Sequence, residues 1–210
     1  MSLPQAQIRF TEDQYLSMER ETDERHEYLD GQIYAMAGES PEHGAICTNL
    51  TGEIRAQLKG TRCQAFAKDT RVRSGPLPRS RYSQKGLYSY PDLVIVCGEL
   101  QFLDENRDTL INPKAIIEVA SPSTEAFDRG EKFRRYRAHN PSLTDYLIVA
   151  QKRPFIEHFT LREDGQWAIA ASVTELSDSV HIASVNCTLQ LAEVYDRVEF
   201  PEEEEEPDDE

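Results

Sequence analysis

Long apolar runs are absent from this chain of 210 residues. A membrane-spanning helix needs roughly 20 apolar residues in a row, and no segment approaches that length. The first ten residues also lack the basic and then apolar pattern of a secretion signal. We therefore expect a cytoplasmic protein with no membrane partner, in which residues 1–200 form one domain with a sizeable core.

Cysteine is scarce as well. The four cysteines contain no C-x-x-C pair, which argues against a zinc knuckle. Cys97 ends an apolar segment and Cys47 lies in a helical pattern. For all four (Cys47, Cys63, Cys97 and Cys187) we expect buried, reduced thiols.

Positive charge is in short supply, with 23 Lys and Arg against 38 Asp and Glu and a net charge of -15. This balance argues against a nucleic-acid partner. However, residues 201–210 hold eight acids and no base, which leaves -7 for the remainder. We expect this tail to be disordered, acting either as a solubilising appendage or as a DNA mimic.

Two stretches are locally basic. Residues 54–90 hold nine Lys or Arg against one acid, and residues 129–137 hold five against Glu131. Such stretches can form a phosphate-binding surface on an acidic molecule, although a solvated face is the simpler interpretation of a charge run alone.

The local patterns predict an α/β (α+β) fold. A capping box at residues 11–14 begins a short helix, and an Asp-Gly turn joins two strands at residues 27–29 and 32–36. Residues 41–58 carry a helical apolar stripe, and residues 64–73 predict a strand pair or one bent strand. A Gly- and Pro-containing loop is expected at residues 74–90.

The second half predicts a mixed sheet with a strand–helix–strand crossover at residues 115–150. Residues 91–96 and 115–120 are apolar strands, and the helix is expected to begin near Asp128, with that carboxylate as its cap. A hairpin at residues 155–172 and a short helix or turn at residues 189–195 complete the chain.

Two acids in the apolar strands are the first candidates for a functional site. Asp92 stands at the head of one strand, and Glu118 lies inside the other, where an acid is costly to bury without a partner. Carboxylates that converge from neighbouring strands suit Mg²⁺ or Mn²⁺, with the carbonyl of Val119 as a third ligand. Lys132, on the following helix, can orient a metal-bound water or balance phosphate charge.

Structural interpretations of the same residues stay open. Asp92 can be an ordinary turn element, and Lys132 can form a surface ion pair with Asp128. Tyr136 is better explained as a packing residue. His43 can line the cleft, but a lone histidine near a helix start is more often structural.

The motifs together resemble the Uma2 family, also called DUF820, which is grouped with the PD-(D/E)XK nucleases of restriction-endonuclease-like fold. The resemblance runs from about residue 11 to residue 161. It is carried by Glu27 to Gly31, Pro41 to Gly44, Pro91-Asp92, Glu118 to Thr124, Asp128 to Lys132 with Tyr136, and Asp145 to Val149.

The resemblance implies a restriction-endonuclease-like core, in which helices flank a central mixed β-sheet, and a metal-dependent endonuclease that hydrolyses DNA. Asp92 and Glu118 would hold the metal, and Glu27 would add an acid from the N-terminal hairpin. The superfamily lysine expected two residues after the acid is replaced by Ala120, so the resemblance assigns that role to Lys132 instead.

The expected nucleic-acid contacts are backbone phosphates held by basic side chains, which we place at Arg79, Arg81, Lys85 and Arg129. A homodimer is expected because two sites cut a duplex most simply. The alternative is a catalytically inactive protein on the same scaffold, which binds nucleic acid or protein. The net charge, the acidic tail and the displaced lysine favour that alternative.

Overall fold

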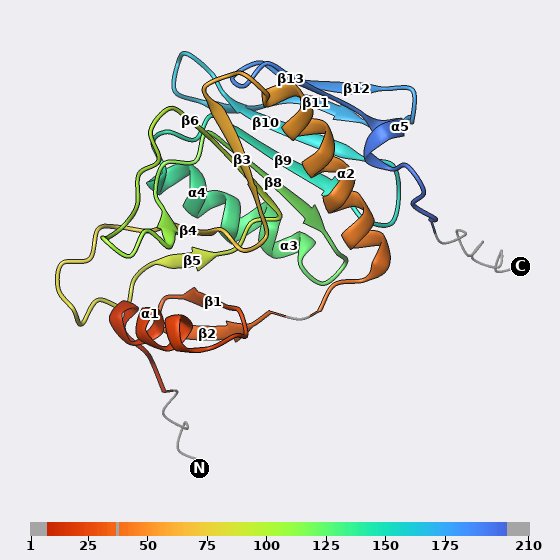
Figure 1. Ribbon diagram of the computed structural model, residues 1–210. Helices are drawn as coiled ribbons and strands as arrows, with labels where there is room; N and C mark the ends of the chain where they lie inside the picture. The colour runs from red at the N-terminus through yellow and green to blue at the C-terminus, as the bar shows by residue number, and fades with distance from the viewer. Residues whose placement is uncertain (1–7, 37, 201–210) are drawn as a thin grey trace, which may run out of the picture.

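The computed structural model (Figure 1) describes residues 8–36 and 38–200, which form a six-stranded sheet, a five-stranded sheet and a separate β-hairpin, with helices packed against them. The larger sheet has six strands in the order β11-β10-β9-β8-β6-β3. Its strands are β3 (Cys63–Ala67), β6 (Leu93–Cys97), β8 (Ala115–Ala120), β9 (Asp145–Ala150), β10 (Ile156–Leu161) and β11 (Trp167–Val173). Only β8 and β9 pair in parallel, and the other neighbours in this sheet are antiparallel.

The smaller sheet has five strands in the order β2-β1-β5-β4-β7. Its strands are β1 (His26–Leu29), β2 (Gln32–Ala35), β4 (Arg71–Ser74), β5 (Leu87–Ser89) and β7 (Thr109–Leu110). Helix α1 (Glu12–Glu21) packs against it through Tyr15, which stacks on Tyr28 of β1. This packing fixes the hairpin that carries Glu27.

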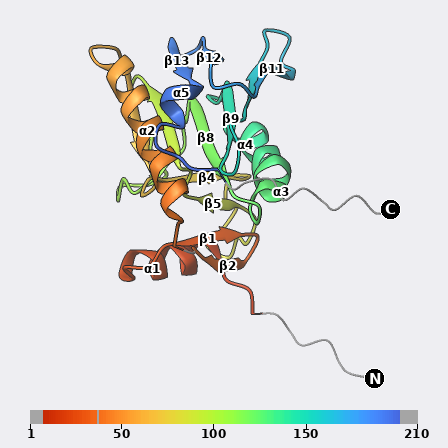
Figure 2. The same cartoon turned by 90° about the vertical axis from the view of Figure 1, so that its right-hand side faces the viewer.

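Helices cover both faces of the larger sheet, as the two views show (Figure 2). Helix α2 (Pro41–Leu58) lies on one face together with α5 (Leu191–Val194) and the hairpin of β12 (Ser179–Ile182) and β13 (Cys187–Gln190). The crossover from β8 to β9 lies on the other face. It consists of α3 (Glu125–Phe127), a π-helical turn η1 (Asp128–Lys132) and α4 (Phe133–His139).

Strand alternation decides which side chains meet which helix, because successive side chains point to opposite faces. Ile117 and Val119 of β8 belong to the core cluster of α2, whereas Ile116 and Ala120 belong to the cluster of α4. Glu118 therefore lies on the α4 face, where the crossover helix can supply a partner.

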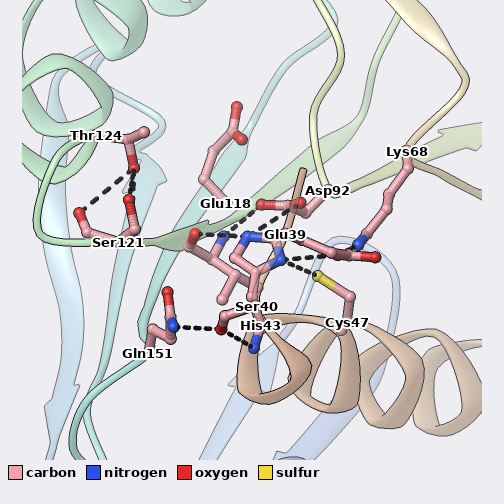
Figure 3. Close-up of polar contacts among 12 residues, drawn as sticks. Glu39, Ser40, His43, Cys47, Lys68, Asp92, Glu118, Ser121, Thr124 and Gln151 are labelled. Carbon is pink, nitrogen blue, oxygen red and sulfur yellow. Dashed lines mark hydrogen bonds and ion pairs between the residues drawn. The ribbon is translucent and has the colours of Figure 1, made fainter. Parts of the chain in front are cut away.

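The start of α2 is fixed by its cap. Ser40 accepts a hydrogen bond from the backbone N–H of His43, and Pro41 occupies the first turn, where its missing N–H costs nothing. Three residues into the helix, His43 then projects toward the ends of β6 and β8 (Figure 3).

The predicted mixed fold is confirmed, and the N-terminal hairpin, α2, the two central strands and the hairpin of β10 and β11 occur where the sequence placed them. Three expectations were wrong. Residues 64–73 contribute strands to two different sheets, and β5 lies within the segment expected to be a loop. The crossover helix begins at Glu125, so Asp128 is inside the helical segment and does not cap it.

The expectation of four reduced thiols was also wrong. Cys63 and Cys97 form a disulfide, because the antiparallel register of β3 and β6 sets them directly opposite each other. Their separation of 34 residues gives no sign of this pairing in the sequence. Cys47 and Cys187 are free and buried, as expected.

Within residues 8–36 and 38–200, no helix is both long enough and apolar enough to cross a membrane. The predicted acidic tail, residues 201–210, falls outside the described residues.

Candidate active site

A cavity of about 950 Å³ opens where the two sheets and the crossover meet. Its walls come from the β1–β2 hairpin, the start of α2, the turn after β3, the head of β6, the end of β8 and the crossover helix. Five residues predicted from the sequence as catalytic or metal-binding line it: Glu27, Asp92, Glu118, Val119 and Lys132.

Asp92 is held at the head of β6 by the neighbouring strand. The backbone N–H of Val119 donates to Asp92 Oδ2 at 2.8 Å, and Oδ1 lies 3.5 Å from Nε2 of His43. Burial alone would raise the pKa of Asp92, but the contacts with His43 and the Val119 N–H outweigh burial and lower it. Asp92 is therefore an ionised carboxylate oriented by β8.

Glu118 meets its partners on the α4 face of β8. Its Oε1 lies 3.1 Å from Nζ of Lys132 and accepts a hydrogen bond from the hydroxyl of Tyr136 at 3.0 Å. Tyr136 in turn shares a hydrogen bond of 2.8 Å with Ser89. Tyr136 is thus a core residue, as expected, whose hydroxyl also positions the Glu118 carboxylate.

Lys132 is buried at the centre of three acids and does not point to solvent. Besides Glu118, its Nζ lies 3.4 Å from Glu27 and 3.4 Å from Asp128. The three acids come from β8, β1 and the π-helical turn, so the lysine joins the two sheets and the crossover. π-helical turns occur frequently at functional sites, and this one turns both Asp128 and Lys132 toward the cavity.

The acids outnumber the cations around Lys132, and the pKa directions reflect this. Burial raises the pKa of Glu118 well above its usual range. Attraction to Lys132 lowers this pKa, whereas repulsion from three acids raises it further: Asp128, Asp92 and Glu27. Burial disfavours the Lys132 ammonium, but Glu118 and Glu27 outweigh burial and raise its pKa.

This donor set fits a hard divalent cation. Glu27, Asp92, Glu118 and Asp128 all line the cavity, where Lys132 and His43 are the nearest groups able to balance their charge. Mg²⁺ and Mn²⁺ take carboxylate and carbonyl oxygens, and a divalent charge would relieve the repulsion that raises the pKa of Glu118. Asp92, Glu118 and the carbonyl of Val119 are the residues able to hold it.

The sequence did not single out several residues of the cavity. Asp128 looked like a helix cap, whereas Lys68 and Glu39 gave no signal at all. Lys68 forms an ion pair with Glu39 at the cavity wall, and its backbone has a positive φ of 25°, an uncommon conformation for a residue other than glycine. His43 also lines the cavity, and its ring nitrogens contact Glu39 and the Val119 carbonyl, so both of its sequence interpretations fit the structure.

The cations expected to contact DNA lie elsewhere. Arg79, Arg81 and Lys85 are exposed on the β4–β5 connection, and none of them lines the cavity. Figure 1 shows this connection (yellow) beside α1, away from the end of β8. Arg129 is half-buried and paired with Glu125 and Glu157. Among the described residues, Arg25 and Lys68 are the cations besides Lys132 that line the cavity.

Part of the basic stretch at residues 54–90 has a structural explanation. Arg73 is buried against Glu12 at 3.0 Å, and Arg71 is buried against Asp108 at 2.9 Å. A buried arginine paired in this way is not available to phosphate. Residues 54–90 therefore present fewer basic side chains to a phosphate than their composition indicates.

Comparisons with known proteins agree with the geometry. Residues 12–192 match the family model of Uma2, which is described as "putative restriction endonuclease". An uncharacterized protein of Synechocystis sp. is 33% identical over 188 residues, which covers 90% of this chain and 92% of that relative. A second uncharacterized Synechocystis protein is 29% identical and covers 77% of this chain and 86% of its own length.

A solved structure has the same fold. It is the crystal structure of a putative nuclease belonging to DUF820 from Anabaena variabilis, with a TM-score of 0.69 and 18% identity, covering 89% of this chain and 97% of that chain. At this identity the likeness establishes the fold alone. The family match over most of the chain and the 33% identical relative show that this protein belongs to the Uma2 family.

Proposed function

We propose that this protein is a metal-dependent endonuclease that hydrolyses phosphodiester bonds of DNA, with the cavity around Lys132 as its active site. The observation that carries the proposal is the buried contact between Glu118 and Lys132, with Asp92 lining the same cavity. Carboxylates that converge in this way are electrostatically costly unless cations compensate their charge, and here one buried lysine faces three of them. Family membership adds support for nuclease chemistry.

The chain's own residues have separable roles. Asp92, Glu118 and the Val119 carbonyl would hold a Mg²⁺ or Mn²⁺ ion, which would supply an activated water and stabilise charge on the phosphate. Lys132 holds Glu118 in place and keeps a fixed positive charge at the site. Glu27 contacts the same ammonium and also accepts from the Tyr90 N–H at 3.3 Å, which links the N-terminal hairpin to the site.

We propose a path for the DNA that differs from the one expected from the sequence. Arg25 and Lys68, which are half-buried and line the cavity, are better placed to contact phosphate there than the exposed Arg79, Arg81 and Lys85. A role for the β4–β5 connection then requires DNA that extends past α1, or a second copy of the chain. We propose a homodimer, because two active sites cut both strands of a duplex most simply. Sedimentation of the protein with and without a DNA duplex tests the dimer.

Cleavage of supercoiled plasmid and of labelled single and double strands tests the proposal. We expect cleavage with Mg²⁺ or Mn²⁺, none with chelator, and none from folded Asp92→Ala or Glu118→Ala. Glu163→Ala is the matched control, because Glu163 is an exposed acid in the β10–β11 turn, away from the cavity. Wild-type protein that leaves every DNA and RNA substrate intact with either metal refutes the enzyme.

A non-catalytic role on the same scaffold has one observation in its favour. Lys132 and Tyr136 both contact the same oxygen of Glu118, so the carboxylate is engaged by protein groups. Calorimetric titration with Mn²⁺ separates the two functions. Heat that disappears in Asp92→Ala supports the metal site, and a flat wild-type titration favours the binding module.

A further inference from the structure

Three side chains of different metal-binding types converge where α2 begins. One ligand atom each from Glu39, His43 and Cys47 lies within 4.8 Å of the other two. Nδ1 of His43 is 3.1 Å from Oε2 of Glu39 and 3.5 Å from Sγ of Cys47. The four-residue spacing sets His43 and Cys47 on one side of α2, and Glu39, which precedes the helix, lies beside them, as Figure 3 shows.

The second ring nitrogen of His43 determines what Nδ1 can do. Nε2 lies 3.1 Å from the carbonyl oxygen of Val119 and 3.5 Å from Oδ1 of Asp92. Both of these atoms are acceptors, so Nε2 carries the proton and donates it. A metal-binding histidine usually donates its other ring N–H to a carbonyl or carboxylate in this way.

Because Nε2 carries the donated proton, Nδ1 is the ring nitrogen able to bind a metal ion. It faces the carboxylate of Glu39 at 3.1 Å. The thiol of Cys47, on the other side of Nδ1, provides a ligand that favours a metal ion.

We propose that Glu39, His43 and Cys47 form a second metal site, which binds a thiophilic divalent cation of the Zn²⁺ type. In a tetrahedral site with bonds of roughly 2.0–2.3 Å, neighbouring ligand atoms lie roughly 3.3–3.7 Å apart, close to the separations observed here. Water completes the coordination from the cavity, which Glu39 and His43 line.

Metal binding would break the S–H bond of Cys47 and the ion pair between Glu39 and Lys68. The S–H bond of Cys47 breaks, a metal–sulfur bond forms, and the proton leaves to solvent. Glu39 exchanges its ion pair with Lys68 for the metal, which releases the Lys68 ammonium beside the cavity.

The site is chemically distinct from the proposed Mg²⁺ site and does not depend on nuclease activity. It offers sulfur and nitrogen together with one carboxylate, and a thiolate discriminates against Mg²⁺. His43 connects the two sites, because its Nε2 contacts Asp92 and Val119 while its Nδ1 faces Glu39 and Cys47. A cation on Nδ1 would therefore fix the imidazole against Asp92.

Titration of the metal-free, full-length protein with Co²⁺, a spectroscopic substitute for Zn²⁺, tests the proposal. We expect one equivalent of Co²⁺ to give the near-ultraviolet charge-transfer band of a cobalt–thiolate bond. Zn²⁺ should abolish the band by displacement, and excess Mg²⁺ should leave it unchanged. Absence of the band, or its loss on addition of Mg²⁺, overturns the proposal.

Variants identify the ligands. Cys47→Ser should lose the band, whereas Cys187→Ser should retain it, because Cys187 is the other free, buried cysteine and lies outside the cluster. Loss of an outer-shell partner typically costs about 10- to 100-fold in metal affinity, and Glu39→Gln, which removes a direct ligand, should cost at least that much. Lys68→Met should tighten Co²⁺ binding by removing the competing cation.

Two further outcomes decide the matter. Glu39 has 45% of its side chain exposed, so its substitution is expected to leave the fold intact even if Cys47→Ser does not. Unchanged Co²⁺ affinity in Glu39→Gln therefore overturns the site. Glu118→Gln should lose DNA cleavage but keep the cobalt–thiolate band, and this pair of results separates failure of the second site from failure of the nuclease proposal.

Discussion

Lys132→Met tests the charge balance of the site, because methionine has nearly the same shape without the ammonium. Lys132 is 6% exposed, and its Nζ lies within 3.4 Å of three acids. Removing one partner of a buried ion pair typically costs about 3–5 kcal/mol, and here three carboxylates lose their shared cation. For a chain of this size 1 kcal/mol corresponds to about 2–4 °C, so the Tm should fall by roughly 6–20 °C.

Glu118→Gln should have a much smaller effect on stability. Lys132 keeps Glu27 and Asp128 as partners in this variant. The raised pKa of Glu118 means that the folded protein binds a proton that the unfolded chain has lost, so folding is penalised above the unfolded pKa. The penalty is about 1.4 kcal/mol per unit of the rise. The amide of Gln has no such penalty, and this gain offsets its weaker contact with Lys132. We therefore expect the free energy of unfolding to lie within about 1 kcal/mol of the wild-type value.

Urea unfolding of wild type, Lys132→Met, Glu118→Gln and the double variant at neutral pH, with chelator present, measures these differences. The double variant should be more stable than Lys132→Met alone, because one of the acids left without a cation is gone. The coupling energy between the two substitutions should be about 0.5–3 kcal/mol, as is usual for residues in direct contact. If Lys132→Met is as stable as wild type, or if Glu118→Gln is the more damaging change, the reasoning about an overcharged acid cluster is wrong.

Three further predictions follow from individual contacts. Tyr136→Phe removes one of the two donors to Oε1 of Glu118 and leaves the buried Ser89 hydroxyl without this partner, so unfolding should become easier by about 1–3 kcal/mol. DNA cleavage by the still-folded variant should slow in single-turnover kinetics. Replacing both Cys63 and Cys97 with Ala should cost about 2–4 kcal/mol, measured by urea unfolding against the oxidised protein and against a reductant-treated sample. Burial would raise the pKa of Asp145, but its hydrogen bonds with His158 and Ser184 outweigh burial and lower it. The ionised carboxylate therefore stabilises the fold above the pKa of the unfolded chain, and this stabilisation is lost as pH falls through the pKa of the folded protein. Asp145→Asn should therefore unfold more easily than wild type at neutral pH, and the difference should narrow in acid-titration melting curves.

The strand acids were predictable because their local surroundings are unusual. Glu118 interrupts an apolar strand, and Asp92 precedes one. Burying a carboxylate there costs free energy unless a partner or a ligand compensates its charge, so both positions indicate a site. Lys132 was predictable from the resemblance to the family, and the structure adds the π-helical turn that brings it to Glu118. The sequence carries no local sign of that turn.

Residues whose role depends on tertiary register escaped prediction. Asp128 fits a helix-cap pattern as well as it fits a cavity wall, and only the start of the helix at Glu125 decides between them. Cys63 and Cys97 become partners only through the pairing of β3 with β6. Likewise, the basic composition of residues 54–90 cannot show that Arg73 is turned inward to Glu12.

The displaced lysine has a physical explanation in the alternation of β8. Residue 120 shares a face with Glu118 because it lies two positions later on the same strand. Ala120 is 5% exposed there and packs in the core cluster that contains Phe133 and Tyr136 of α4. A lysine at this position would lie under the helix, so its small side chain allows α4 to approach. The cation then reaches Glu118 from Lys132, immediately before α4, and the same approach brings the Tyr136 hydroxyl to that carboxylate.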